Sequence, residues 1–168
     1  MPAKIPDDEL VFAIDPGNVE SAFCKLKGGV IHEFHKVPNG MLLHLLRDTR
    51  YDHVACEMIC SYGMAAGASL FDTCVFIGEI RAASRCRVVL LPRIQVKSHV
   101  CHSGKATDSN IRQALIDKYG PQGTKKNPGP TYGITADCWS ALAIADTYIS
   151  GDYVPYILSS DKTPCTAS

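Results

Sequence analysis

One short stretch constrains the fold of this chain more than any other: residues 10–17, with the sequence LVFAIDPG. Five apolar residues in a row are typical of a β-strand buried on both faces, although periodicity alone does not exclude a short helix. The Pro-Gly pair ends the strand, because it is a strong turn signal. Asp15 therefore stands where a buried strand leaves the core, a position suited to a catalytic or metal-binding carboxylate. The alternative is a plain turn residue, since Asp before Pro-Gly also suits a β-turn.

The composition is that of an ordinary globular protein. The 168 residues are 46% hydrophobic and 20% charged, and one domain of this length buries a substantial core. No apolar run approaches the roughly 20 residues that cross a membrane, and the N-terminus lacks the hydrophobic segment of a signal peptide. We therefore expect a cytoplasmic protein whose eight scattered cysteines are core thiols. We divide the chain into an N-terminal extension (1–9), one domain (10–151) and a C-terminal tail (152–168).

Charge is unevenly distributed along the chain, although the formal net charge is zero. Residues 1–80 hold six Lys and Arg against 11 Asp and Glu, whereas residues 81–126 hold ten against two. A basic segment that faces acidic positions suggests a polyanion held against metal-binding carboxylates. The alternative is a solvated basic face without a ligand.

The first half of the chain predicts a sheet with antiparallel and parallel strands. Residues 21–27 and 30–37 have strand character, and the Gly-Gly pair between them is a hairpin signal, so with the first strand they form a three-strand meander. Beyond a short helix at 41–47, strands and a helix alternate, which implies parallel pairing. These later elements are a strand at 53–59, a helix at 64–83 and a strand at 87–91. The predicted fold class is therefore α/β, a mixed sheet flanked by helices.

A polar connection and a capped helix are predicted after these strands. Residues 97–106 have the composition of a polar connection. A helix follows at 109–119, because Thr107 or Asp108 can cap its start and a Gly-Pro pair ends it.

A basic loop separates this helix from the last one. The loop at 121–130 is rich in Gly, Pro and Lys, and we expect its Lys125 and Lys126 to contact a phosphate backbone. An apolar helix then begins near Ala136 and ends at Gly151.

Two further carboxylates accompany apolar elements. Glu57 lies near the end of the strand at 53–59, where a buried carboxylate needs water, a partner or a metal. Asp137 begins the last helix, on the same face as Ser140. The alternatives are an ordinary strand-end residue for Glu57 and, for Asp137, a first-turn acid favoured by the helix dipole.

Four motifs in this order resemble those of RuvC-type Holliday junction resolvases, in particular the divergent RuvC-like proteins of phage and prophage type. They are residues 14–17 (IDPG), Glu57 on the next apolar strand, residues 95–97 (QVK) before a loop with Gly104, and Asp137 followed by residues 141–145 (ALAIA). The resemblance extends over most of the chain.

The resemblance implies a ribonuclease H-like fold and a Mg²⁺-dependent DNA endonuclease that acts as a homodimer on branched DNA such as a four-way junction. By position, Asp15, Glu57 and Asp137 would be the ligands of two metal ions, and Lys97 would face the scissile phosphate. The cell would be bacterial or phage-infected. A recombination helicase partner is not identified by the sequence.

The chain departs from the family pattern at two positions. Asp108 stands where the family has a second basic residue, and Lys105 and Arg112 are the candidates to replace it. Ser140 stands where the family has a second acid on the last helix. Because a neutral hydroxyl is a weak Mg²⁺ ligand, we expect retained activity with weaker metal binding or a preference for Mn²⁺.

Two aromatic residues and one helix surface complete the candidates. Tyr62, which follows the strand of Glu57, is a candidate for stacking on an unpaired base, with packing as the alternative. Trp139 is expected to pack in the core. The helix whose small residues begin at Ala65 is a candidate dimer surface.

Two other functions stay open at the level of the sequence. The same fold class supports nucleases that cut flaps or RNA–DNA hybrids, since fold does not settle substrate. A non-catalytic branched-DNA-binding protein would keep the fold, with Ser140 as the sign of a decayed site. The three carboxylates argue against that alternative.

Overall fold

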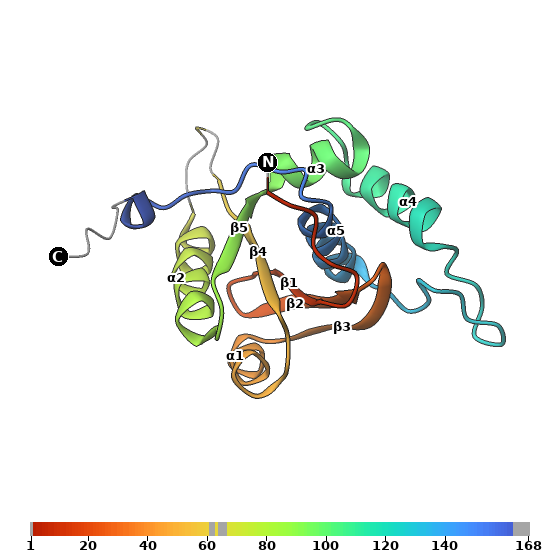
Figure 1. The fold of residues 1–168 in the computed structure, drawn as a ribbon, viewed down its shortest axis with the longest axis horizontal. Helices are drawn as coiled ribbons and strands as arrows, with labels where there is room; N and C mark the ends of the chain where they lie inside the picture. Colours follow the sequence, from red (N-terminus) through yellow and green to blue (C-terminus); the bar gives the residue numbers. More distant parts are fainter. Residues whose placement is uncertain (1, 61–62, 64–66, 163–168) are drawn as a thin grey trace.

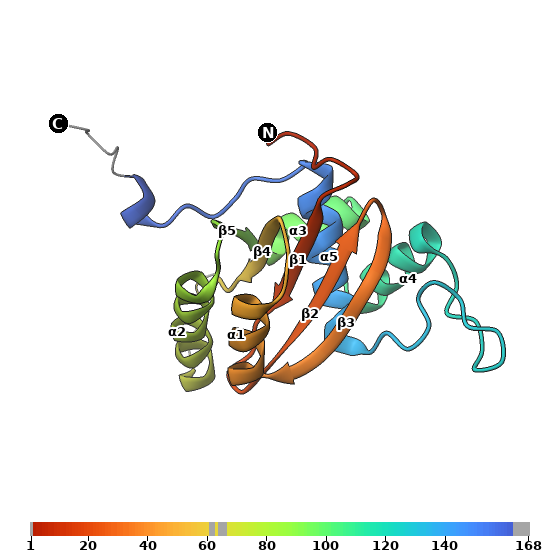
Figure 2. The ribbon, with the colours of Figure 1, turned by 60° about the horizontal axis from the view of Figure 1, so that its bottom comes forward.

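A five-stranded mixed sheet with helices on both faces forms the centre of the protein (Figure 1, Figure 2). The computed structural model describes residues 2–60, 63 and 67–162. The strand order across the sheet is β3-β2-β1-β4-β5. The strands are β1 (Leu10–Asp15), β2 (Glu20–Lys27), β3 (Val30–Pro38), β4 (His53–Met58) and β5 (Val88–Pro92). Among the helices of the described residues, none is long and apolar enough to cross a membrane.

The pairing of the strands confirms the predicted fold class. β1, β2 and β3 form an antiparallel meander, and β4 and β5 join β1 in parallel. Gly28 and Gly29 turn the hairpin between β2 and β3 with φ angles of 56° and 73°. Only glycine adopts this left-handed conformation without a steric cost, so the Gly-Gly pair fixes the place of the turn.

β1 is buried on both faces, as its apolar run predicted. Its four central residues, Val11 to Ile14, have no exposed surface. Because side chains alternate along a strand, Phe12 and Ile14 pack against α1 and α2, whereas Val11 and Ala13 pack against α3, α4 and α5. The sheet thus separates two hydrophobic cores. The helices are α1 (Asn39–Asp48), α2 (Ala68–Ala83), α3 (Arg93–Cys101), α4 (Asp108–Tyr119) and α5 (Ala136–Ser150).

The prediction of a polar connection at 97–106 is wrong for its first half. Residues up to Cys101 belong to α3, and His102 ends the helix with a φ of 55°. The sequence does not predict this helix, because Val96 is its one buried residue among the described ones and no apolar periodicity marks it. Lys97 is therefore carried by a helix that follows directly from the end of β5.

The ends of α4 and α5 follow the predicted capping chemistry. The Thr107 hydroxyl accepts a hydrogen bond from the Asn110 amide at 3.3 Å, and the Thr107 amide donates to the Asn110 side chain at 2.9 Å. Thr107, rather than Asp108, is thus the N-cap of α4. Gly151 ends α5 with a φ of 71°.

The basic loop at 121–130 projects from the body of the protein beyond the end of α4 (Figure 1). An antiparallel bridge between Gly123 and Pro128 closes it into a small hairpin. Lys125 and Lys126 lie at its exposed tip.

A buried carboxylate holds α3, α4 and α5 together. Asp146 on α5 is 5% exposed, and it accepts hydrogen bonds from Lys118 at 2.6 Å and from the Tyr119 hydroxyl at 2.5 Å. His99 of α3 lies 3.3 Å from its other oxygen. Burial raises the pKa of Asp146, but the hydrogen bonds from His99, Lys118 and Tyr119 outweigh burial and lower it. This cluster fixes the two helices that carry the basic residues against α5.

The C-terminal tail, from residue 152 onward, passes along the edge strand β5 of the sheet and is hydrogen-bonded to it (Figure 2). The Tyr156 amide donates a hydrogen bond to the Leu90 carbonyl at 2.8 Å. Arg81, near the end of α2, contacts Asp161 at 3.0 Å within a short 3₁₀ helix, Ser159–Lys162.

Candidate active site

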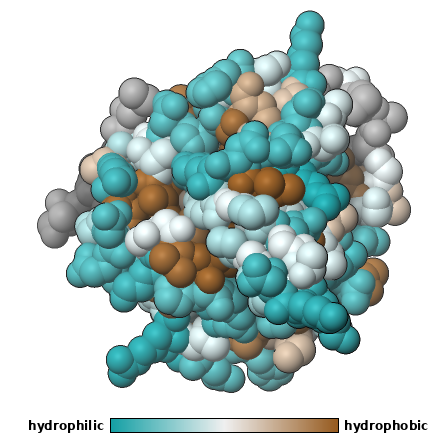
Figure 3. Space-filling model, turned by 90° about the vertical axis from the view of Figure 1, so that its right-hand side faces the viewer, coloured by the Kyte–Doolittle hydropathy of each residue, from teal (hydrophilic) through white to brown (hydrophobic). Residues whose placement is uncertain are grey.

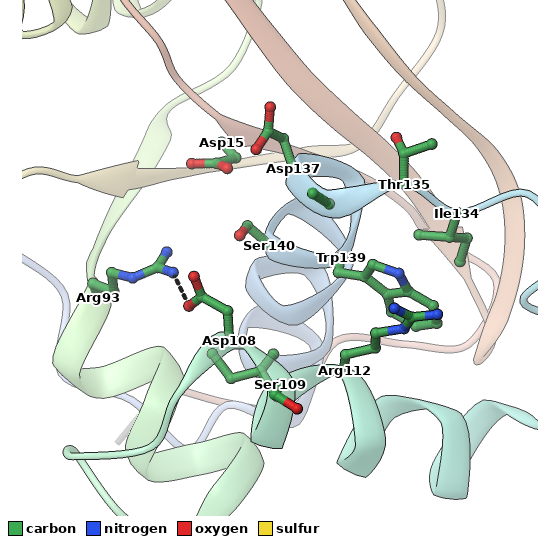
Figure 4. Close-up of a pocket in the computed structure, with 12 residues that line it drawn as sticks. Asp15, Arg93, Asp108, Ser109, Arg112, Ile134, Thr135, Asp137, Trp139 and Ser140 are labelled. Carbon is green, nitrogen blue, oxygen red and sulfur yellow. Dashed lines mark hydrogen bonds and ion pairs between the residues drawn. The ribbon is translucent and has the colours of Figure 1, made fainter.

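Three carboxylates meet at one end of the sheet. Asp15 ends β1 and Glu57 lies near the end of β4; the two strands are parallel neighbours in which Ile14 pairs with Cys56. Both side chains therefore reach the same edge. Asp137 is the second residue of α5, which starts at this edge (Figure 4). The three predicted metal ligands thus lie at the same edge of the sheet on three different elements, and the charges of Glu57 and Asp137 act on Asp15.

The carboxyl group of Asp15 is buried and lies close to other negative charges. Burial raises its pKa from 3.8 to about 7, with further contributions from the charges of Glu57 and Asp137. The positive charge of Arg93 and a hydrogen bond from the Ser140 hydroxyl act in the opposite direction. A cation beside Asp15 would relieve this repulsion, so the site is electrostatically suited to one.

Glu57 is held by an arginine that the sequence analysis did not identify. Nη1 of Arg93 lies 2.9 Å from Oε2 of Glu57, which is 7% exposed. Nη2 of the same guanidinium lies 2.6 Å from Oδ1 of Asp108 (Figure 4). Burial raises the pKa of Glu57, and the charge and hydrogen bond of Arg93 oppose that rise. A cation placed directly after the carboxyl end of a parallel strand was the available signal for Arg93.

Asp137 is held by a lysine that the sequence analysis also missed. Nζ of Lys36, on β3, lies 2.7 Å from Oδ2 of Asp137 and 3.8 Å from Glu20. The hydrogen bond to Asp137 and its charge raise the pKa of Lys36. No local pattern marks Lys36, because its partner lies on a helix at the other end of the chain.

Ser140 follows Asp137 by one helical turn and points to the same site (Figure 4). Its hydroxyl donates a hydrogen bond to the Asp15 carboxylate. Asp146, the next acid on α5, is engaged by Lys118 and Tyr119 and does not contribute to this site. The oxygen donors at this edge are therefore three carboxylates and one neutral hydroxyl.

An open cleft of about 630 Å³ borders the carboxylates, between α5 and the start of α4 (Figure 4). Asp15, Asp137 and Arg93 line one part of it, and Arg112 and Trp139 line another. The Arg112 guanidinium lies 5.7 Å from the centre of the Trp139 ring, a cation–π arrangement. Trp139 is 5% exposed, so the predicted core packing is confirmed, and its ring also supports Arg112.

Lys97 lies near the site, whereas Lys105 lies elsewhere. The charge of Lys97 lowers the pKa of Glu57, and Lys97 lines a small hollow next to Arg93. Lys105 lines a separate hollow between α3 and α4.

Lys125 and Lys126 are carried away from the cleft by the projecting loop. The face that includes α4 and this loop is mainly hydrophilic, with small separate hydrophobic areas (Figure 3). Tyr62 and Ala65 lie outside the described residues, so their predicted roles stay predictions.

The donor chemistry of the site fits a hard divalent cation. Carboxylate oxygens are the ligands that Mg²⁺ and Mn²⁺ prefer. Within residues 2–60, 63 and 67–162, no three His, Cys, Asp or Glu side chains converge as a ready-made metal site. One oxygen of Glu57 and one of Asp137 instead contact Arg93 and Lys36.

Solved structures show what this fold is similar to. No protein-family model and no curated protein sequence matches the chain. The structure of RuvC from Thermus thermophilus matches with a TM-score of 0.66 and 19% identity, covering 88% of this chain and 99% of that one. T. thermophilus RuvC in complex with a Holliday junction substrate matches with a TM-score of 0.61 and 17% identity over the same shares. The chain therefore has the RuvC-like fold of the ribonuclease H-like class, as its sequence motifs predicted.

Proposed function

We propose that the protein is a metal-dependent endonuclease that cuts branched DNA, with the four-way junction as its substrate. The observation that carries this proposal is the position of Asp15, Glu57 and Asp137 at one edge of the sheet, where Asp15 and Asp137 line an open cleft with Arg93 and Arg112. The likeness to RuvC bound to a Holliday junction substrate supports the choice of DNA structure. We assign the activity to the domain at residues 10–151.

The carboxylates are proposed to hold Mg²⁺ or Mn²⁺. Ions bound by Asp15, Glu57 and Asp137 would supply an activated water and neutralise charge on the phosphate. The Ser140 hydroxyl lowers the pKa of Asp15 and adds no negative charge to the site. Since less charge then compensates a second ion, we expect weaker Mg²⁺ binding and a relative preference for Mn²⁺.

The DNA is proposed to cross the cleft and extend toward the basic loop. Lys97 and Arg112 border the site, and Lys125 and Lys126 reach out from the projecting tip, where they suit the phosphates of a duplex arm. Lys105 lies in a separate hollow, so Arg112 is the better supported of the two candidate replacements for a base at position 108.

Two copies of the chain are proposed to act together, because a four-way junction presents two equivalent strands to cut. On α2, Phe71 and Val75 lie one turn apart and are 59% and 66% exposed. Such a pair of large apolar side chains on one helix face is suited to a self-complementary contact. We expect α2 to pair with α2 of a second copy.

Cleavage of a synthetic four-way junction tests the proposal. The junction, a matched duplex, a flap and an RNA–DNA hybrid are incubated with the protein in Mg²⁺ and in Mn²⁺, beside Asp15→Asn. We expect cuts in the junction alone, and none with Asp15→Asn. Asp7→Asn, which changes an exposed carboxylate far from the site, should cut like the parent.

Other outcomes identify the alternatives. Cuts in the flap or the hybrid, with an intact junction, would make the protein a nuclease of different substrate. Tight junction binding without any cut in either metal would make it a non-catalytic branched-DNA-binding protein.

A further inference from the structure

Arg93 is fixed between two acidic side chains from different elements. It is the first residue of α3 and follows Pro92, the last residue of β5, so the sheet determines its position. Its guanidinium contacts Glu57 at 2.9 Å and Asp108 at 2.6 Å. One contact comes from the neighbouring strand and the other from the start of α4. The two together orient the plane of the guanidinium.

Neutralisation of Glu57 alone does not account for this arrangement. Glu57 is buried, and its own ion pair with Arg93 already supplies one opposite charge. The side chain of Asp108 is 79% exposed, so water would solvate its carboxylate without Arg93. An exposed ion pair also contributes little to stability. The contact with Asp108 therefore serves mainly to hold Arg93 in one place.

That place borders the cleft next to the carboxylates. Arg93 lines the same cleft as Asp15 and Asp137, and its charge lowers the pKa of Asp15. Its side chain is 31% exposed, which leaves part of the guanidinium accessible. A guanidinium has five N–H donors in a planar fork, and two contacts leave donors for a ligand in the cleft. A phosphodiester matches such a fork through its two non-bridging oxygens.

We propose that Arg93 binds the phosphodiester that is cut, by donating hydrogen bonds to a non-bridging oxygen, and that Asp108 positions it. The proposal rests on the proposed function, since it places the scissile phosphate in this cleft. Asp108, which stands where the family has a basic residue, then contributes to the site by positioning the Arg93 guanidinium. Arg93 supplies the positive charge that position 108 lacks.

A binding cycle between protein and DNA tests this contact. The cut position is first mapped with the parent protein. Binding is then measured in Mg²⁺ with Asp15→Asn, which should not cut, and with Asp15→Asn/Arg93→Gln. Each protein is given a junction with the native linkage or a neutral methylphosphonate at the cut position. Removal of either partner of a charged hydrogen bond should weaken binding about tenfold to 100-fold.

If Arg93 contacts this phosphate, the losses of binding affinity caused by Arg93→Gln and by the methylphosphonate should not add. Arg93→Gln should weaken binding of the native junction but have little further effect on the methylphosphonate junction. Arg87→Gln is the matched control, because Arg87 precedes β5 and Arg93 follows it, at the opposite end of the same strand. Its effect should be equal on both junctions.

Additive losses for Arg93 would overturn the proposal while leaving the nuclease function intact. A parent protein that cuts no junction would reject the proposed function, and the phosphate contact with it. If thermal melting shows that Arg93→Gln does not fold, Arg93→Lys replaces it. Lysine keeps the charge beside Glu57 but loses the fork, so a smaller, still non-additive loss is expected. Equal losses on both junctions would again reject the contact.

Discussion

Replacement of Asp15 by Asn should stabilise the metal-free protein at neutral pH while it abolishes cleavage. The Asp15 carboxyl is buried beside the charges of Glu57 and Asp137, and its pKa is about 7 against an ordinary 3.8. Asparagine has nearly the same size and can still accept a hydrogen bond from Ser140. It carries no charge, so the substitution removes the repulsion and keeps the packing.

The pH dependence of the effect follows from the direction of the pKa change. Between pH 4 and 7 the folded state keeps the Asp15 proton, whereas the unfolded state has lost it. The free energy of unfolding of the parent protein therefore falls as the pH rises through this range. A difference of about three pH units corresponds to about 4 kcal/mol. Asp15→Asn does not undergo this loss of stability. The free energy of unfolding of the variant should therefore exceed that of the parent by near zero at pH 4 and by at most about 4 kcal/mol at pH 8.

Urea unfolding in EDTA measures the difference. Curves for the parent and for Asp15→Asn are recorded at pH 5 and pH 8, with the exposed Asp7→Asn as control. Mg²⁺ should then stabilise the parent more than the variant, because the cation compensates the carboxylate charge. A variant that is no more stable than the parent at pH 8 would refute the view that Asp15 carries uncompensated buried charge.

Three further predictions concern residues around the site, the helices and the DNA surface. Glu57→Gln and Asp137→Asn should each bring junction cleavage below detection and leave junction binding unchanged in a gel shift; a variant that cuts at the parental rate removes that residue from the site. Asp146→Asn should lower the free energy of unfolding by about 2–3 kcal/mol in urea, because it breaks a buried charged network. The loss should shrink as the pH falls through the pKa of Asp146, which its hydrogen bonds hold below the ordinary 3.8. An unchanged free energy of unfolding at pH 7 would contradict the role of that network. Replacement of Lys125 and Lys126 by Ala should reduce the slope of log binding constant against log salt by about 1–2 with an unchanged cleavage rate at saturation, and an unchanged slope would place the loop off the DNA.

Local signals explain why the sheet was predictable from the sequence. The apolar run of β1, the Gly28-Gly29 turn and the Thr107 cap each act within a few residues of the chain. Their outcome depends little on distant partners. α3 lacks such a signal, because it buries only Val96 among its described residues, and β5 and the packing of α5 hold it in place instead.

The residues of the site likewise fall into those that local sequence signals predict and those that they do not. Asp15 and Glu57 were recognisable because an acid at the end of a buried strand is unusual, and Asp137 followed from its place in the order of motifs. Arg93 and Lys36 were missed, because their roles depend on contacts between distant segments: Arg93 lies 36 residues from Glu57. Only the folded sheet brings those cations to the acids.

The balance of charges at the site suggests why a neutral hydroxyl, rather than a carboxylate, stands at position 140. Burial, together with the charges of Glu57 and Asp137, already holds the pKa of Asp15 near 7, even with the charge of Arg93 close by. A fourth carboxylate at position 140 would add like charge directly beside Asp15, at the point where a hydroxyl now donates a hydrogen bond. Arg93 remains next to Glu57 as a fixed cation at this edge. A site that carries its own guanidinium needs less metal charge to neutralise a phosphate, so it also needs fewer acids to hold that metal. The fixed charge of Arg93 thus accompanies the absence of an acid at position 140.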